Sequence, residues 1–141
     1  MPITDTFLPA HTFTVRVYYE DTDLAGIVYH ANYLKFFERA RTEYLRDLGI
    51  DQTAMASEVA GVFFAVRGMD IDFLAAARFD DVLTVQSMPI GMTGARGTMD
   101  QRILCGERVL CTARVTVACL TRAGRPTRIP QAARAAFPPK A

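Results

Sequence analysis

The sequence predicts an α+β fold in which a five-stranded, mainly antiparallel sheet wraps around one long helix. Residues 31–48 repeat their apolar side chains with the period of an amphipathic helix. Five other stretches carry the apolar and alternating patterns that are typical of β-strands. The chain has 141 residues, which is the length of one domain. We therefore expect a single domain over residues 1–141, with its core at about 12–121 and irregular ends.

The helix expected at 31–48 has one apolar arc, and charged residues occupy its other side. Eighteen residues at about 1.5 Å each give a length of about 27 Å, enough to cross a sheet, and Gly49 follows as the C′ glycine. Arg41 alone interrupts the arc, which predicts a guanidinium reaching water at its edge, a buried ion pair or a subunit contact. The arc consists of Tyr33, Leu34, Phe37, Ala40, Tyr44, Leu45 and Leu48.

The strands are expected at 12–19, around 68–73 and 83–86, at 98–104 and at 109–120. Gly106-Glu107 fits a two-residue type II′ turn, which would place Cys105 opposite Arg108 and Cys111 opposite Arg102. Sheet edges of this length favour pairing with another chain, so we expect a homo-oligomer.

Composition excludes several classes of function. The 16 basic and 15 acidic residues leave a net charge of +1, too small for electrostatic capture of nucleic acid. No signal peptide or membrane-length apolar run is present, which favours the cytoplasm. The three cysteines form no CxxC motif, and Cys111 and Cys119 are expected as buried small apolar residues. The two histidines stand 19 positions apart without paired ligands, so no metal site is expected.

The segment 17–33 is the most informative, because a strand delivers acidic residues into a loop that runs directly into the helix. The free N–H groups and the positive dipole end of a helix N-terminus can stabilise an oxyanion. Gly26 would let the backbone approach a ligand closely. Each residue type also has a purely structural explanation: Asp21 and Asp23 in a turn, Asn32 as an N-cap, and His30 as a hydrogen-bonded histidine.

A calcium-binding loop is a weaker interpretation of the same segment. Asp21 and Asp23 would be its first and third ligands, but Ala25 stands at the fifth place and Asn32, which lacks a carboxylate, at the twelfth.

Three segments of this region, RVYYEDTD at 16–23, GIVYHANY at 26–33 and FFERARTE at 36–43, resemble the Tol-Pal-associated acyl-CoA thioesterases. These belong to the 4-hydroxybenzoyl-CoA thioesterase family of hotdog folds. The resemblance covers about residues 16–130, and its further matches are at 66–67, 77–81, Leu83, 101–103, Pro126 and Pro130.

The resemblance implies hydrolysis of an acyl-CoA thioester without a cofactor. Asp23 matches the catalytic carboxylate, and the position of His30 matches the residue whose backbone N–H contacts the thioester carbonyl. Gly26, Tyr29 and the His30 side chain would line the pocket. The family forms dimers or tetramers with CoA along the subunit interface.

The CoA phosphates are expected near Arg96 and Thr98, although this segment keeps only one basic residue. Asp100 is a further departure, since an apolar residue is more usual there.

Several alternatives remain open from the sequence. Asp23 could be a nucleophile or a general base, and another hotdog branch uses a helix glutamate, for which Glu38 or Glu43 would be candidates. A hotdog enoyl-CoA hydratase also pairs an aspartate with a histidine, but more closely than the seven positions between Asp23 and His30. A non-catalytic module that binds acyl-CoA or an acyl carrier protein is the third alternative. No side chain in the sequence indicates which acyl group the protein binds.

Overall fold

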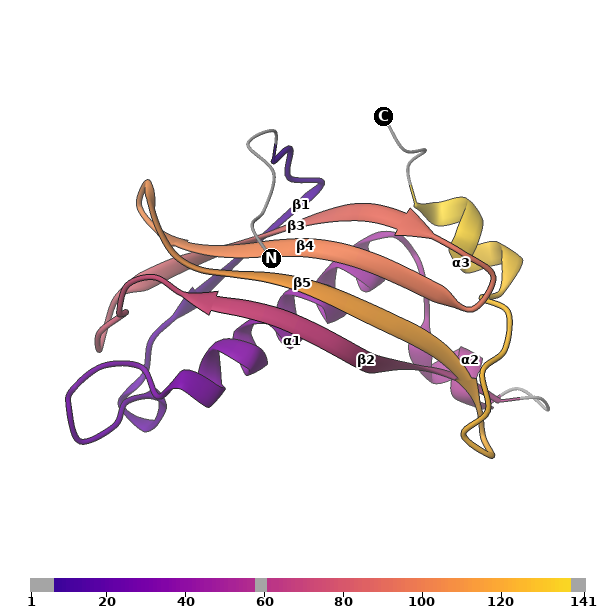
Figure 1. Cartoon of the computed structure of the whole chain (residues 1–141), viewed down its shortest axis with the longest axis horizontal. Helices are drawn as coiled ribbons and strands as arrows, with labels where there is room; N and C mark the ends of the chain where they lie inside the picture. Colours follow the sequence, from indigo (N-terminus) through magenta and orange to yellow (C-terminus); the bar gives the residue numbers. More distant parts are fainter. Residues whose placement is uncertain (1–6, 58–60, 138–141) are drawn as a thin grey trace.

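The computed structural model describes residues 7–57 and 61–137. Five strands form one curved sheet, and α1 (His30–Asp47) lies across its concave face (Figure 1). The strands are β1 (His11–Arg16), β2 (Val62–Phe73), β3 (Val82–Met92), β4 (Arg96–Cys105) and β5 (Arg108–Thr121). Two short helices, α2 (Gln52–Ser57) and α3 (Gln131–Ala136), and a 3-10 turn (Tyr19–Asp21) complete the described elements.

The strand order in the sheet is β1-β3-β4-β5-β2, and every pairing is antiparallel. This confirms the predicted α+β class with a five-stranded sheet around one long helix. β1 and β2 are the two edges, so the last strand in the chain lies inside the sheet, next to β2.

The turn between β4 and β5 confirms part of the predicted register. Gly106 has φ +61° and Cys105 pairs with Arg108, as a type II′ turn requires. The expected pairing of Cys111 with Arg102 is wrong, because the register shifts after Ile103 and Cys111 pairs with Ile103 instead. One extra residue, Leu110, sits in β5 at this bulge, and its carbonyl accepts the N–H of Leu74 and of Ala75.

The helix begins one residue earlier than expected and buries a slightly rotated face. Phe36 is fully buried, whereas Leu34, which the periodicity placed in the arc, is 40% exposed. Gly49 follows the helix as the predicted C′ glycine, with φ +81°. Its N–H donates to Arg46 O, and the N–H of Ile50 donates to Leu45 O. The buried residues of α1 are Asn32, Tyr33, Phe36, Phe37, Ala40 and Tyr44.

Strand β1 is shorter than predicted. It ends at Arg16, and the chain then enters the 3-10 turn, so Tyr19, which was expected in the strand, lies in the turn and is 83% exposed. Beyond the expected core, Ile129 and Ala133 bury themselves against Cys119 in a second small cluster. The C-terminal part is therefore more ordered than its irregular composition predicts.

Among the described residues, Arg41 forms no ion pair, so this one of its three predicted environments is wrong, and a subunit contact stays a prediction. It is half-buried, and its NH1 donates to the neutral amide oxygen of Gln101 at 2.9 Å. The buried carboxylate of the sheet is instead Asp100, which binds Arg114 across β4 and β5. Cys111 and Cys119 are buried and Cys105 is partly buried, all three as free thiols.

Among the described residues, no helix combines the length and apolar character needed to cross a membrane.

Candidate active site

Asp21 holds together the loop that precedes α1. Its Oδ2 accepts the N–H of Tyr18 at 2.8 Å, and its backbone carbonyl accepts both the N–H of Tyr29 and the side-chain amide of Asn32 at 2.9 Å. This confirms that Asp21 has a structural hydrogen bond. Asn32 is not the N-cap, because Tyr29 occupies that position, and its side chain links the first turn of the helix to the loop.

Asp23 sits at the turn of the same loop, with its side chain toward the surface. Its backbone N–H donates to Ile27 O, and its Oδ1 accepts the N–H of Ala25 at 2.9 Å. Gly26 closes the turn with φ +80°, a conformation that L side chains adopt only with strain. One carboxylate oxygen of Asp23 has no hydrogen bond within the described chain, so it is free to meet a substrate.

On its other side, the loop is fixed to the connection between β2 and β3. Ile27 pairs with Arg78, Val28 N donates to Ala77 O, and Ala77 N donates to the hydroxyl of Tyr33 at 3.0 Å. Burial raises the pKa of the Tyr33 hydroxyl, and the carboxylate of Asp23 contributes to that rise. The charge of Asp23 therefore lies within electrostatic range of the helix face that bears Tyr33.

His30 is the first residue of α1. The N–H groups of a first helical turn have no carbonyl within the helix to bind, so they present partial positive charge beside the loop. The His30 ring lies 4.6 Å from the Tyr29 ring and 6.0 Å from the Phe73 ring at the end of β2. Tyr29, His30 and Phe73 are all exposed, which leaves an open aromatic surface where the loop that contains Asp23 meets α1.

The predicted catalytic residues are thus brought together at one end of the sheet, whereas Arg96 lies at the other. Figure 1 shows the loop at the start of α1 on one side and the turn between β3 and β4 on the opposite side. Arg96 is exposed at the first position of β4, and Thr98 is half-buried two residues along the strand.

Sequence reasoning missed two arginines that lie close to the Arg96 turn. Arg134 NH1 donates to the carbonyl oxygens of Thr93 and Gly94. The backbone N–H of Ile129, the residue after Arg128, also donates to Gly94 O, which places Arg128 beside this turn. The basic residues of the C-terminal segment 122–134 were the signal, but their approach to β4 depends on how that segment folds back.

The two helix glutamates do not face the Asp23 loop. Glu38 is exposed and its Oε1 accepts the Thr42 hydroxyl, while Glu43 binds Arg46 on the same helix. Glu43 is therefore explained by a solvated helix face. Glu38 lies at a cavity that the sequence did not predict.

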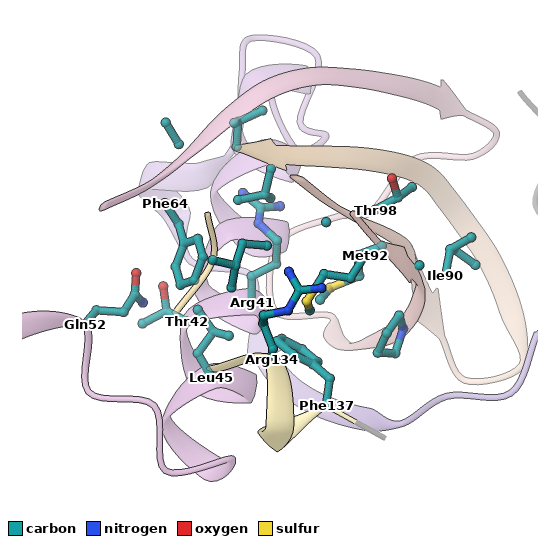
Figure 2. A pocket seen from close by; sticks show the side chains of 18 of the residues that line it. Arg41, Thr42, Leu45, Gln52, Phe64, Ile90, Met92, Thr98, Arg134 and Phe137 are labelled. Carbon is teal, nitrogen blue, oxygen red and sulfur yellow. The ribbon is translucent and has the colours of Figure 1, made fainter. Parts of the chain in front are cut away.

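That cavity, of about 410 Å³, lies between the second half of α1 and the end of the sheet that carries Arg96 (Figure 2). Leu45, Phe64, Met92 and Phe137 contribute to its apolar wall, and Arg41 and Arg134 reach it from α1 and α3. It does not include Asp23, Gly26, Tyr29 or His30. Arg41 in the middle of an apolar helix face was the only sign of it in the sequence.

A free carboxylate beside the N-terminus of a helix is suited to acyl transfer. The carboxylate can attack a carbonyl carbon or activate water, while the helix N–H groups stabilise the oxyanion that develops. In the part of the chain that the structure describes, no three His, Cys, Asp or Glu side chains are grouped to hold a metal ion. The fold and the site together fit a thioesterase of the hotdog class.

Comparison with known proteins agrees with this class. Residues 17–137 match the thioesterase-like superfamily. The chain is 44% identical over 127 residues to the acyl-CoA thioesterase YbgC of Haemophilus influenzae, covering 89% of this chain and 93% of that protein. It is 47% identical over 107 residues to the acyl-CoA thioester hydrolase YbgC of Escherichia coli O6:H1, covering 75% and 78%.

Solved structures give the same result. A probable thioesterase from Bartonella henselae superimposes with a TM-score of 0.83 at 48% identity, covering 85% of this chain and 98% of that one. A 1,4-dihydroxy-2-naphthoyl-CoA thioesterase from Synechocystis gives a TM-score of 0.82 at 26% identity, covering 89% and 93%. The chain belongs to the thioesterase-like superfamily, which confirms the predicted family and hotdog fold.

Proposed function

We propose that this protein hydrolyses an acyl-CoA thioester to the carboxylic acid and free CoA, and that each chain is a single hotdog domain. The observation that carries the proposal is the free Asp23 carboxylate in a rigid loop beside the first turn of α1. The similarity to two proteins named acyl-CoA thioesterase or thioester hydrolase, at 44% and 47% identity, supports the same substrate class. The direct test is turnover of a panel of acyl-CoA thioesters, measured as released thiol.

Two reaction sequences fit this geometry. In the first, an oxygen of Asp23 attacks the thioester carbon, CoA leaves as its thiolate, and water hydrolyses the resulting acid anhydride. In the second, Asp23 removes a proton from water, which attacks the same carbon directly. In both, the carbonyl oxygen becomes an oxyanion that the backbone N–H groups at His30 stabilise. Gly26, Tyr29 and the His30 ring would form the walls around the thioester.

The complete site is proposed to need two subunits. The loop that contains Asp23 lies at the Phe73 end of β2, because His30, which follows this loop, contacts Phe73. Arg96 lies at the other end, because Arg96 and Ala65 pair with the same residue, Ala118. If two β2 edges pair antiparallel about a twofold axis, the Phe73 end of one strand meets the Val62 end of the other. The Asp23 loop would then lie near Arg96 of the partner subunit.

The exposed edge of β2 supports such a pairing. The strand has 12 residues, so about 40 Å of backbone edge is open to another chain. Its exposed side chains include Phe63, Val66 and Phe73. A dimer would cover both the backbone edge and these side chains, and a tetramer would be built from two such dimers.

We expect the protein to be at least dimeric at micromolar concentration, because an unpaired edge of this length is costly to leave open. Sedimentation velocity combined with activity measurements will check this. A fully active monomer of 15.6 kDa would contradict the shared site.

We propose that Arg96, with Thr98 beside it, contacts a CoA phosphate. Replacing Arg96 by alanine should raise KM about tenfold and leave kcat nearly unchanged, since a charge-assisted contact of about 1.4 kcal/mol is lost. Arg108 at the opposite end of the hairpin is a matched control, because it is also an exposed first residue of a strand. An unchanged KM in Arg96→Ala would remove this residue from the site.

A hydratase and a non-catalytic binding module are the remaining alternatives. An enoyl-CoA hydratase would add water to an unsaturated substrate and release no thiol from a saturated one. A module that binds acyl-CoA or an acyl carrier protein would retain binding without turnover across the whole panel.

The three free thiols are consistent with a reducing compartment, and we place the protein in the cytoplasm.

A further inference from the structure

The cavity between α1, the sheet and α3 has the size and lining of a small-molecule site. Its volume of about 410 Å³ lies within the usual range for such sites, roughly 300 to 1,000 Å³. Aliphatic, aromatic and thioether side chains form most of the wall, among them Leu45, Phe64, Met92 and Phe137 (Figure 2). A ligand with a hydrocarbon body would fit these walls.

Arg41 places a fixed positive charge in the wall of this cavity. The amide nitrogen of the fully buried Gln101 donates to Phe37 O at 3.1 Å and to the hydroxyl of Ser87 at 3.0 Å. This orients the amide oxygen of Gln101 toward Arg41, whose NH1 donates to it. A guanidinium has five N–H donors, and this is the one hydrogen bond recorded for Arg41 within the described chain.

The charge of Arg41 is not neutralised by a close carboxylate. Among residues 7–57 and 61–137, no carboxylate oxygen lies within 4.0 Å of its guanidinium. Burial lowers the pKa of Arg41, and the more distant carboxylate of Glu38 opposes that shift only in part. Arg134 adds a second guanidinium to the wall, held by the carbonyl oxygens of Thr93 and Gly94.

We propose that this cavity binds an aliphatic carboxylate, with the carboxylate on the guanidinium of Arg41 and the hydrocarbon chain against the apolar wall. A carboxylate can accept two parallel N–H bonds from one guanidinium, and this contact would offset the cost of burying the charge. A monoanion suits the site better than a phosphate ester, because Glu38 at the same cavity repels additional negative charge. Thr98, which is proposed above to contact CoA, also lines this cavity, so the proposal adds a carboxylate subsite next to the proposed CoA site. Binding of the carboxylate itself does not require thioester hydrolysis.

The test compares two ligands of equal chain length, octanoate and 1-octanol, by isothermal titration calorimetry. The Asp23→Asn variant is used as the host, so that the proposed catalytic carboxylate takes no part in binding. We expect one octanoate per chain and at least tenfold weaker binding of octanol. Arg41→Gln in this host should weaken octanoate binding at least tenfold and leave octanol binding nearly unchanged, because only the charge contact is lost.

Arg39→Gln is the matched control, since it removes an exposed arginine from the same helix, near Phe36 and outside the cavity. It should leave octanoate binding unchanged. If Arg41→Gln does not fold, as judged by its thermal melting, Arg41→Lys keeps the charge without the planar fork and should bind octanoate with intermediate affinity.

Equal affinity for octanoate and octanol in the host would overturn the proposal, since it would mean that only apolar contacts act. Loss of octanoate binding on His30→Ala but not on Arg41→Gln would also overturn it, by placing the carboxylate at the Asp23 loop. Absence of thioesterase turnover in the wild-type protein would contradict the proposed function and leave this binding experiment unaffected.

Discussion

Replacing Asp23 by asparagine is expected to lower kcat by at least about 10²-fold while the protein remains folded. The substitution keeps the size of the side chain and its acceptor for the N–H of Ala25, but it removes the charge that acts as nucleophile or base. Asp23 is exposed at a turn, so loss of its charge should change the melting temperature little. Steady-state kinetics with acyl-CoA and thermal melting of the same preparation will check both parts.

Asp21→Asn is the control for this prediction, because it makes the same chemical change two residues earlier in the same loop. Asp21 accepts the backbone N–H of Tyr18, and its own backbone carbonyl anchors Tyr29 and Asn32. We expect a loss of about 1 kcal/mol in stability and a milder kinetic effect than at position 23. If Asp23→Asn kept most of its turnover while Asp21→Asn or Glu38→Gln lost it, the catalytic assignment would be wrong.

Arg114→Met is expected to have the largest effect on stability. The carboxylate of Asp100 is fully buried and accepts two hydrogen bonds from Arg114, at 2.6 and 2.8 Å. These bonds raise the pKa of the Arg114 guanidinium, as expected for a close ion pair. Removing the cation leaves a buried charge without a partner, which costs about 3 kcal/mol and lowers Tm by roughly 10 °C. Chemical denaturation will measure the change.

The double variant Asp100→Leu/Arg114→Met tests whether the cost comes from the unpaired charge. Replacing both members of a buried ion pair by apolar side chains of similar volume is often neutral. We therefore expect the double variant to recover most of the stability lost in Arg114→Met. A double variant whose loss equals the sum of the two single-variant losses would show that the two side chains do not act as a pair, and would contradict this explanation.

The local elements of this protein were predictable because their signals lie within short stretches of sequence. The period of residues 31–48 predicted α1 to within one residue at each end, and Gly49 marked its end. The strand patterns predicted the presence of all five strands, although β1 stops earlier than its pattern, and β2 and β3 extend well beyond theirs. The segment 16–43 was long and specific enough to identify the family and to propose Asp23 and His30, which the fold places at the same loop.

The features that depend on distant residues were decided only by the tertiary structure. The sheet order and the bulge at Leu110 arise from pairing between strands that are distant in the sequence. The register of such a pair depends on the neighbouring strand, and the periodicity of one strand does not reveal it. The bond between Arg41 and Gln101 joins residues 60 positions apart, and the cavity beside it forms only when α3 folds back onto the sheet. Local sequence determined the helix and the acidic loop, whereas long-range packing determined the cavity, the buried pair and the separation of Asp23 from Arg96, because burial is a property of the whole fold.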